Sequence, residues 1–586
     1  MHKFAVSCLL AMLAISGMAH AKVDENKVCL YSDPEYKGQE TCFSVGQHGW
    51  VGDQINDKVS SIRLYGNAYA KIYSNGSFRG QHTVVMANTY KLDAMDDAIS
   101  SLKVGVRNSN DFACLFEHNG FRGTPYCLEA GQSISDLDNT VLRRNEGASL
   151  LVSGKTKVTL FEYPNFDKNR QHSQMTRSSS NLGERPGDWQ DENVDSFQVS
   201  KRFSTETEKA IDLTETLSSE LPLTHLQVLA SHNSFNSTAY FSGQLIPGPN
   251  HRRSLAEQLQ LGVRFFELDV RRGDGYTTVC HSFDCRFSSF KISLRRLLGE
   301  VDSWLKGADP NDVVFFYLQD DMSNDQEGYK QLEKDIKWMG SEVYSIDSCS
   351  TVPKDLTLKK IRDSGARVFF YKDTGNTGCS FAPSVMMGNG FEKNIGVASI
   401  NMHDPHFDVD TFLRSQECHN NFCHDTVTAD EARVGIINGV NAIGLDMLEE
   451  SDLDNKSGRL NKQLWAFGPE TSFGAYSNGR TASFLGKGDR FMKVDWDKQQ
   501  KFACREQDGE WNVSHQQGRI VQGKSICEAD FPGSTFDVPM NPVEAQALRD
   551  KMAPDEVIHV NFGYKGNHLW APGKWGTLGS RMGNIP

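Results

Sequence analysis

Apolar residues follow two different patterns along the chain, and the change between them divides it. Across Val28–Ser200, short alternating runs recur in units of about 40 residues, a period typical of repeated structural units. Beyond Ser219 the apolar runs become continuous, as in Val263–Val270 and Val313–Leu318, and helical stretches such as Leu294–Leu305 separate them. Continuous apolar runs that alternate with helices predict buried parallel strands. We therefore expect an all-β N-terminal part followed by an α/β barrel.

Three further segments frame these parts. Residues 1–21 combine Lys3, an apolar run and Ala19-His20-Ala21, a pattern typical of a secretory signal peptide. No later apolar stretch is long enough to cross a bilayer, so we expect a protein secreted to the periplasm or the medium. Residues 201–219 are dense in Thr, Glu and Ser and predict a polar linker. The expected domains are the signal peptide (1–21), two β domains (22–107 and 108–204), the barrel (205–470) and a small, mostly β appendage (471–586).

The β units share an aromatic and glycine pattern. It consists of Tyr31, Tyr36 and Gly38 in the first copy, Tyr73, Phe78 and Gly80 in the second, Phe116, Phe121 and Gly123 in the third, and Phe161, Phe166 and Lys168 in the fourth. Each copy then reaches a serine, at Ser60, Ser100, Ser149 and Ser196. Glycine tolerates a positive φ that other residues resist, so the pattern predicts a hairpin in each copy.

Four such units resemble the Greek-key motifs of βγ-crystallins, which pair into two domains. Copies one and two also resemble that family's calcium-binding hexapeptide, (Asn/Asp)₂-x-x-(Ser/Thr)-Ser. The matching residues are Asn56, Asp57, Ser60 and Ser61 in copy one and Asp96, Asp97, Ser100 and Ser101 in copy two. Residues 145–150 and 192–197 break the pattern, so the resemblance implies calcium binding in the first domain only. The alternative is that these acidic turns are simply solvated.

Polar residues cluster at the ends of the first barrel strands. His232 and Asn233 follow one apolar run, Glu267 and Asp269 lie two apart in the next, and His281 ends a third. In a strand, that spacing puts both carboxylates on one face, where they repel unless a cation is present. Asn233 and the two acids offer the hard oxygen ligands that Ca²⁺ prefers. The two histidines suit a general base and a general acid.

The segments around these residues carry a family resemblance. Ser-His-Asn-Ser-Phe, Phe-Glu-Leu-Asp-Val and Cys-His-Ser-Phe resemble the catalytic X region of calcium-dependent phosphatidylinositol-specific phospholipase C. The resemblance implies a distorted (β/α)₈ barrel that cleaves the bond between diacylglycerol and phosphate, with the inositol 2-hydroxyl attacking. It also implies that His232 serves the attacking hydroxyl and that His281 protonates the leaving glycerol oxygen.

Three later strand ends extend the resemblance. Eukaryotic members have a calcium-binding glutamate where this chain has Gln319, so Asp320 is the expected fourth ligand. Lys372 matches a phosphate-contacting lysine, and an exposed strand-end lysine is the alternative. Asp446 resembles the acid that orients the base histidine in bacterial relatives, where a carboxylate on the far nitrogen fixes the tautomer.

The expected partner is a phospholipid membrane surface, contacted peripherally, and we expect no nucleic-acid partner. A net charge of −13 argues against simple attraction to anionic lipid, so calcium bridging or aromatic insertion would supply the contact. Two alternatives stay open. One is a glycerophosphodiester or sphingomyelin phosphodiesterase on the same barrel; the other is a non-catalytic calcium-dependent binding protein.

The cysteines fall into neighbouring couples. Of the thirteen, Cys8 leaves with the signal peptide, and an even number in an exported chain predicts disulfides. The couples are Cys29/Cys42, Cys114/Cys127, Cys280/Cys285, Cys349/Cys379, Cys418/Cys423 and Cys504/Cys527. A zinc site formed by Cys418-His419 and Cys423-His424 is the alternative for one of them.

Overall fold

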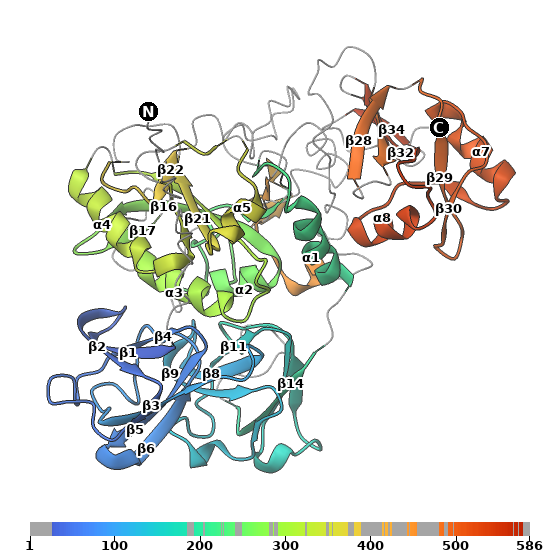
Figure 1. Cartoon of the computed structure of the whole chain (residues 1–586). Coiled ribbons are helices and arrows are strands. Elements are labelled where there is room, and N and C mark those ends of the chain that lie inside the picture. The colour runs from blue at the N-terminus through green and yellow to red at the C-terminus, as the bar shows by residue number, and fades with distance from the viewer. Residues whose placement is uncertain are drawn as a thin grey trace, which may run out of the picture.

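The computed structural model shows three lobes that follow one another along the chain (Figure 1). It describes residues 26–183, 193–202, 206–223, 226, 228–240, 249–280, 285, 291–322, 325–346, 351–353, 355–372, 380–387, 413–414, 417–419, 422–424, 442–444, 446–453, 480–485, 490–495, 497–565, 568–571 and 574–577. The predicted signal peptide, His281 and the couple Cys349/Cys379 lie outside these residues.

The first lobe is all-β. Its strands are β1 (Lys27–Asp33), β2 (Lys37–Ser44), β3 (Gly46–His48), β4 (Ser61–Tyr65), β5 (Ala68–Asn75), β6 (Arg79–Val85), β7 (Ser101–Val106), β8 (Phe112–His118), β9 (Arg122–Glu129), β10 (Ser133–Ile134), β11 (Ser149–Ser153), β12 (Thr156–Phe161), β13 (His172–Met175) and β14 (Ser196–Lys201). They form sheets ordered β2-β1-β4, β3-β7-β5-β6, β11-β8-β9 and β10-β14-β12-β13.

Neighbouring repeats exchange a strand. The third strand of repeat one, β3, joins the sheet of repeat two, and β10 of repeat three joins the sheet of repeat four. In the other direction, Thr89 of repeat two forms an isolated bridge with Ile62 in β4 of repeat one. Ser179 of repeat four likewise forms one with Leu150 in β11 of repeat three. The predicted all-β Greek-key region is confirmed, because this exchange interlocks the repeats in two pairs.

A buried serine hydroxyl holds the first hairpin of each repeat. The N–H of Tyr36 donates to Ser61 Oγ (3.0 Å), and Ser61 donates to the carbonyl of Asp33 (2.7 Å). Tyr36 and Gly38 have φ values of 56° and 75°, as expected for the hairpin. The same two bonds are made by Ser101 with Phe78 and Asn75, by Ser149 with Phe121 and His118, and by Ser196 with Phe166 and Tyr163.

These bonds correct the alignment of the repeats. The serines that correspond to one another are Ser61, Ser101, Ser149 and Ser196. The predicted equivalence of Ser60 and Ser100 with the later two is wrong by one residue. Because side chains alternate along a strand, that shift moves a hydroxyl from the hairpin to the opposite side of the chain.

The second lobe is built on a mainly parallel sheet. Its strands include β15 (Val228–Ser231), β16 (Val263–Arg272), β17 (Thr277–Val279), β18 (Ile292–Ser293), β19 (Val314–Asp320), β20 (Val343–Tyr344), β21 (Val368–Lys372), β22 (Val385–Met387), β23 (Leu413–Arg414) and β26 (Ala442–Gly444). The order is β20-β21-β19-β16-β15-β26-β23 with every neighbour in that order parallel. The α/β class is confirmed. Closure into a (β/α)₈ barrel stays a prediction, since 388–412 and 425–441 lie outside the described residues.

Helices pack against both sides of this sheet, the one at 358–363 on the side of Phe265 and Tyr317. They are α2 (Leu255–Gln260), α3 (Leu294–Leu305), α4 (Gln326–Lys337) and α5 (Leu358–Asp363), and their N-caps are Ser254, Ser293, Asp325 and Thr357. Each cap side chain accepts a backbone N–H of the first turn, which satisfies a donor that the helix leaves unpaired. Alternate strand residues such as Phe266, Phe316 and Leu318 pack toward α3 and α4. Phe265 and Tyr317 pack on the opposite side.

The segment predicted as a polar linker contains a helix. In α1 (Glu206–Ser218), Ala210 and Ile211 are buried in the same apolar core as the sheet. The linker prediction is wrong because only a narrow stripe of the helix is apolar. The other buried positions of the helix include Thr207, Glu208 and Thr214, which gave the segment the composition of a solvated connection.

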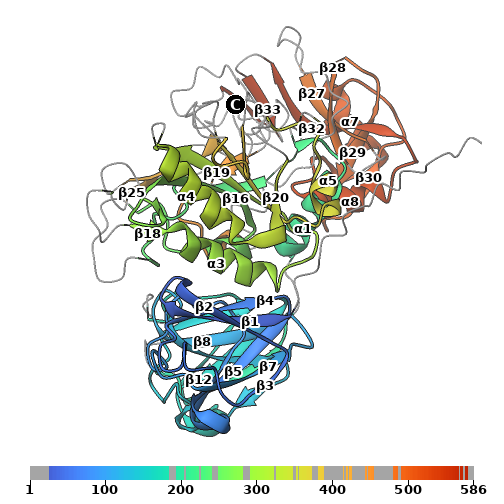
Figure 2. The same cartoon turned by 60° about the vertical axis from the view of Figure 1, so that its left-hand side comes forward.

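The first lobe packs directly against the helices of the second (Figure 2). The Tyr36 ring stacks on Trp338, with ring centres 5.0 Å apart, and the Arg63 guanidinium lies 3.5 Å from the centre of the Trp338 ring. The N–H of Asn88 donates to Ser303 Oγ (3.0 Å). Aromatic and polar contacts of this kind fix the two lobes relative to each other.

The third lobe contains a mixed sheet and two short helices. Its elements are β27 (Arg480–Leu485), β28 (Arg490–Asp495), β29 (Lys501–Arg505), β30 (Trp511–Val513), α7 (Gly523–Asp530), β31 (Thr535–Phe536), α8 (Pro542–Arg549), β32 (Val557–Lys565), β33 (His568–Ala571) and β34 (Lys574–Thr577). Val543 of α8 packs against the core of the second lobe. The mostly β appendage therefore exists and is docked.

Four of the six cysteine couples are disulfides in the described part of the chain. These are Cys29–Cys42, Cys114–Cys127, Cys280–Cys285 and Cys504–Cys527. Cys418 and Cys423 face each other across the hairpin of β24 (Glu417–His419) and β25 (Phe422–His424), and their side chains are outside the description. Among the described helices, none has the length and apolar character needed to cross a bilayer.

Candidate active site

His232 and Asn233 form the turn at the carboxyl end of β15. Asn233 has a φ of 46°, a left-handed conformation that asparagine tolerates better than most residues. Its N–H donates to Glu267 Oε2 (2.6 Å), and its Nδ2 donates to His232 Nε2 (3.1 Å). Because the side-chain Nδ2 of Asn233 is bonded to the His232 ring, its side-chain oxygen Oδ1 is the atom that can ligate a cation. The turn thus joins the predicted base to the acid pair.

Glu267 and Asp269 lie side by side on β16 and are almost fully buried, at 3% and 1% exposure. Asp269 Oδ2 has no hydrogen-bond partner within the described residues. Burial, together with the charge of Glu267, raises the pKa of Asp269 to about 8. A buried carboxylate with an unsatisfied oxygen beside a second acid fits a divalent cation, which would neutralise both.

Gln319 occupies the position next to this pair. Parallel pairing of β16 with β19 sets it opposite Asp269. In the amide orientation that satisfies its hydrogen bonds, Gln319 Nε2 donates to Glu267 Oε1 (3.0 Å) and Asp269 Oδ1 (3.2 Å). A rotation of the amide by 180° would present its oxygen instead. Gln319 can therefore stabilise the acids without a cation and ligate one when it is bound.

The predicted fourth ligand, Asp320, lies on the other side of the strand. Its carboxylate accepts from Lys372 Nζ and from the Tyr329 hydroxyl, and these partners lower its pKa although burial alone would raise it. Lys372 is only 5% exposed, so the alternative that it is simply an exposed lysine at a strand end is also wrong. Successive strand residues point to opposite faces. That alternation brings Gln319, rather than Asp320 or Lys372, to the acid pair.

Asp446 follows β26 and lies beside the ring of His232. Its Oδ2 is 3.9 Å from His232 Nδ1, and Asn250 Nδ2 donates to the same oxygen (3.0 Å). Burial raises the pKa of Asp446, but His232, His251 and Asn250 outweigh it and the pKa is lowered. An ionised carboxylate on the Nδ1 side leaves Nε2 as the proton-accepting atom.

Asn250 and His251 belong to the site and carry no signal in the sequence pattern. His251 Nε2 donates to the carbonyl of His232 (2.8 Å). Both residues are buried, and they stand a few residues before α2 rather than at the end of a predicted strand. Only the neighbouring positions of a histidine and an amide residue could have indicated them.

His281 lies outside the described residues, but its neighbour Cys280 is defined. The N–H of Cys280 donates to the carbonyl of Asp269 (3.2 Å). Cys280 and Cys285 form a disulfide, so the short segment that contains His281 in the sequence begins and ends at a cross-link. The chain therefore enters the segment of the predicted general acid directly beside the acid pair.

The predicted crystallin calcium residues come together across repeats. Ser100 Oγ donates to Asp57 Oδ1 (3.3 Å), and Asp57 has a φ of 54°, matched by 50° at Asp97. Burial and the charges of Asp96 and Asp57 raise the pKa of Asp97. Asn56 Oδ1 and Asp96 Oδ1 are buried without hydrogen-bond partners among the described residues. Ser60 is buried as well, whereas Ser61 and Ser101 hold the hairpins.

The corresponding region of repeats three and four contains a guanidinium. The N–H of Asn145 donates to the carbonyl of Val194, as that of Asp57 does to Ile99, so Arg144 stands where repeat one has Asn56. This corrects the alignment of 145–150 by one residue. Arg144 donates to Asp136 (Nε–Oδ1 2.8 Å). The Arg144 guanidinium thus supplies a positive charge to the acidic residues of this turn, and the absence of calcium binding in this pair of repeats stays a prediction.

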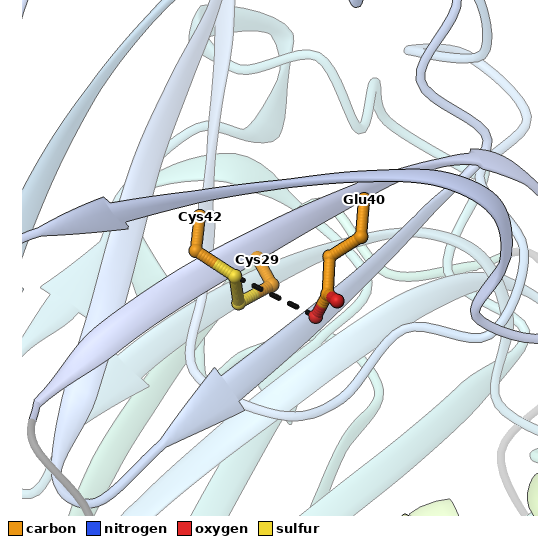
Figure 3. A group of neighbouring side chains, drawn as sticks. All are labelled: Cys29, Glu40 and Cys42. Atoms are coloured by element: carbon orange, nitrogen blue, oxygen red, sulfur yellow. Dashed lines mark hydrogen bonds between the residues drawn. A yellow bond between two sulfur atoms is a disulfide. The ribbon is translucent and has the colours of Figure 1, made fainter.

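Two other groups of metal-ligating side chains occur in the first lobe. Figure 3 shows Glu40 beside Cys29 and Cys42, whose sulfurs form a disulfide and are therefore not thiolate ligands. The second group contains Asp93, Glu117 and His118. Its carboxylates accept from Lys91 and from backbone N–H groups, including that of Thr124, so protein donors already satisfy them.

Comparison with known proteins supports the assignment of the second lobe. Residues 203–413 match the family described as the Rv2075c PI-PLC-like domain. The chain contains a PI-PLC-like domain. Two uncharacterized proteins from two strains of Mycobacterium tuberculosis, MT2135 and Rv2075c, are each 24% identical to it over 370 residues, which cover 56% of this chain and 73% of theirs. His232 and the acid pair lie within the PI-PLC-like domain, and Asp446 lies beyond the matched residues.

The first lobe also has relatives. Residues 18–85 match peptidase inhibitor family I36, and a development-specific protein S homolog from Myxococcus xanthus is 29% identical over 129 residues, covering 22% of this chain and 73% of that protein. The solution structure of protein S complexed with calcium is 21% identical, with a TM-score of 0.22, and covers 30% of this chain and 99% of that one. A βγ-crystallin domain from Flavobacterium johnsoniae is 24% identical, with a TM-score of 0.13, and covers 14% and 97%.

Proposed function

We propose that the protein is an exported phosphodiesterase that cleaves the glycerol–phosphate bond of phosphatidylinositol-type phospholipids. The observation that carries the proposal is the arrangement around His232. One ring nitrogen faces a buried carboxylate, and the other faces Asn233 and Glu267 at the edge of a buried acid pair. This arrangement supplies a base beside a cation site, which is what an intramolecular attack on a phosphodiester requires.

His232 is the proposed general base. Its Nε2 takes the proton of the inositol 2-hydroxyl as that oxygen attacks phosphorus, and the charge of Asp446 stabilises the imidazolium that forms. The glycerol oxygen leaves as the new phosphorus–oxygen bond is made. His281, in the segment that begins at Cys280, is the proposed donor of the proton that this oxygen needs. The products are a cyclic inositol phosphate and diacylglycerol.

Asn233, Glu267 and Asp269 are the proposed ligands of a calcium ion, with the Gln319 amide oxygen as the fourth. When bound, the ion supplies positive charge that polarises the phosphoryl group. Glu267 also accepts the N–H of Asn233, so the acid that would hold the ion fixes the turn that carries the base. Asp320 and Lys372 have a different proposed role, which is to fix the end of β19 against β21 and α4.

The first lobe is the proposed site of further calcium binding, through Asp57, Asp97 and their neighbours. Calcium would satisfy the buried oxygens of Asn56 and Asp96 and would stabilise the lobe rather than take part in catalysis. A peripheral contact with a phospholipid surface is part of the proposal, because the substrate is a membrane lipid. Export is supported by four disulfides, which form in oxidising compartments.

The test is hydrolysis of a lipid panel by the mature chain. Vesicles would contain phosphatidylinositol, phosphatidylcholine or sphingomyelin, and glycerophosphoinositol would be a soluble probe, each with calcium and with chelator. We expect diacylglycerol and cyclic inositol phosphate from phosphatidylinositol only, with calcium only. His232→Ala should abolish this release. Turnover of sphingomyelin or of the soluble diester alone would identify another phosphodiesterase, and no turnover of any probe would favour a binding protein.

A further inference from the structure

Two buried residues outside the proposed catalytic set connect the loops that carry His232 and Asp446. We propose that Asn250 and His251 are positioning residues for the general base. The proposal rests on the proposed function, because it concerns how the base is held. Both side chains are buried, at 6% and 1% exposure, so neither is placed to touch a substrate.

Asn250 joins the two loops through its backbone and its side chain. Its N–H donates to the carbonyl of Asn236 (3.0 Å), and its own carbonyl accepts the N–H of Met447 (2.8 Å). Its Nδ2 donates to Asp446 Oδ2 (3.0 Å) and lies 3.4 Å from His232 Nδ1. Its Oδ1 accepts from Asn236 Nδ2 (2.8 Å). Asn250 therefore holds the carboxylate on the Nδ1 side of the ring.

His251 holds the backbone of the base itself. Its Nε2 donates to the carbonyl of His232 (2.8 Å), and its main chain bonds to Asn236 and Thr238 (both 3.0 Å). The ring faces one acid, with Nε2 3.9 Å from Asp446 Oδ1. Since Nδ1 has no hydrogen-bond partner within the described residues, the single bond from Nε2 is the ring's specific polar contact.

The chemical requirement explains why such a bond matters. A general base works only when its nitrogen lies within hydrogen-bond reach of the proton it removes, and a displacement of about 1 Å costs about 100-fold in rate. Fixing the carbonyl of His232 fixes the point from which its side chain projects. Loss of this bond should therefore lower kcat without weakening substrate binding.

The experiment compares donor-free and donor-retaining substitutions at two buried histidines. His559, in the third lobe, is also buried and donates from Nε2 to a backbone carbonyl, that of Lys498 (2.9 Å). His251→Phe should lower kcat about 30- to 100-fold with KM changed less than about threefold, and His251→Gln, which keeps an N–H, should recover to within about fivefold. His559→Phe and His559→Gln should both keep kcat within about twofold of the wild type.

The kcat of Asn250→Leu should fall as that of His251→Phe does, because the substitution frees Asp446 from its place beside the His232 ring. A kcat for His251→Phe within threefold of the wild type, or a loss equal to that of His559→Phe, would overturn the proposal. If the wild type is inactive on every phosphodiester probe, the proposed function fails instead. In that case ¹⁵N-histidine NMR still decides the positioning role: the tautomer of His232 should change in Asn250→Leu, which releases Asp446 from the Nδ1 side, and not in His559→Phe, and an unchanged His232 tautomer in Asn250→Leu would refute it.

Discussion

Replacing Asp269 with asparagine should stabilise the calcium-free protein while removing its response to calcium at the proposed site of the second lobe. In the folded chain the pKa of Asp269 is raised to about 8 from a usual value of 3.8. At pH 7, about 3 pH units above the ordinary pKa, the carboxyl would be ionised in the unfolded chain but still favours the proton in the folded one. At about 1.36 kcal/mol per unit, this difference lowers the free energy of unfolding by about 4 kcal/mol. Asparagine removes the repulsion from Glu267 but keeps a polar group buried, so we expect a net gain of about 1–3 kcal/mol.

The effect of the Asp269 carboxyl on stability depends on pH in a way that can be measured. Because the folded-state pKa is raised, the contribution of Asp269 to stability is present below pH about 4 and is lost progressively as the pH rises toward 8. Chemical denaturation in chelator should therefore show a larger difference between variant and wild type at pH 7.5 than at pH 5. With calcium at about 100 times its dissociation constant, the wild type should gain about 2.7 kcal/mol and the variant nothing from this site.

Asp320→Asn is the matched control, because it removes a carboxylate at the end of the adjacent strand. Its partners are Lys372 and Tyr329, so this change should destabilise the protein in chelator and leave the calcium response in place. If Asp269→Asn destabilises the chelated protein at both pH values, the acid pair is not a strained cation site and the calcium assignment fails.

Three further outcomes are expected. Asp57→Ala combined with Asp97→Ala in the full-length chain should abolish the calcium-dependent rise in Tm of the first lobe, measured by calorimetry, and an unchanged rise would place those sites elsewhere. Gln319→Glu should tighten calcium binding about 10-fold in titrations by adding a third carboxylate and should lower stability in chelator; weaker binding would contradict the ligand assignment. On an inositol phosphate ester of a phenol, whose anion leaves without a proton, His281→Ala should regain much of its lost rate while His232→Ala stays inactive; equal rescue of both would mean shared roles.

The parts of the fold that repeat or alternate could be predicted from the sequence. The hairpins followed from the aromatic and glycine pattern, since a positive φ at Gly38 is a local requirement that neighbouring repeats share. The side-by-side acids followed from the two-residue period of a strand. The same period, applied to β19, would have placed Gln319 rather than Asp320 beside them.

The remaining parts depend on contacts between distant segments. Asn250 and His251 owe their place to bonds with Asn236 and Met447, which no local pattern announces. The helix α1 could not be predicted from the sequence because packing against an existing core stabilises a helix that has only a narrow apolar stripe. The one-residue correction that aligns Arg144 with Asn56 likewise became visible only from the backbone bond between Asn145 and Val194. Each of these features is set by tertiary structure rather than by spacing.

The contact between Tyr36 and helix α3 of the second lobe has an evolutionary consequence. A Cβ on Gly299 would lie 2.8 Å from the Tyr36 hydroxyl, so alanine at 299 would require the Tyr36 ring to move from its place on Trp338. The Tyr36 ring also rests on Trp338, which would be exposed if the first lobe were absent. Substitutions on the two sides must therefore be inherited together. A descendant that lost the repeats would need a new surface on the helices of its second lobe, which makes this pairing of domains hard to reverse.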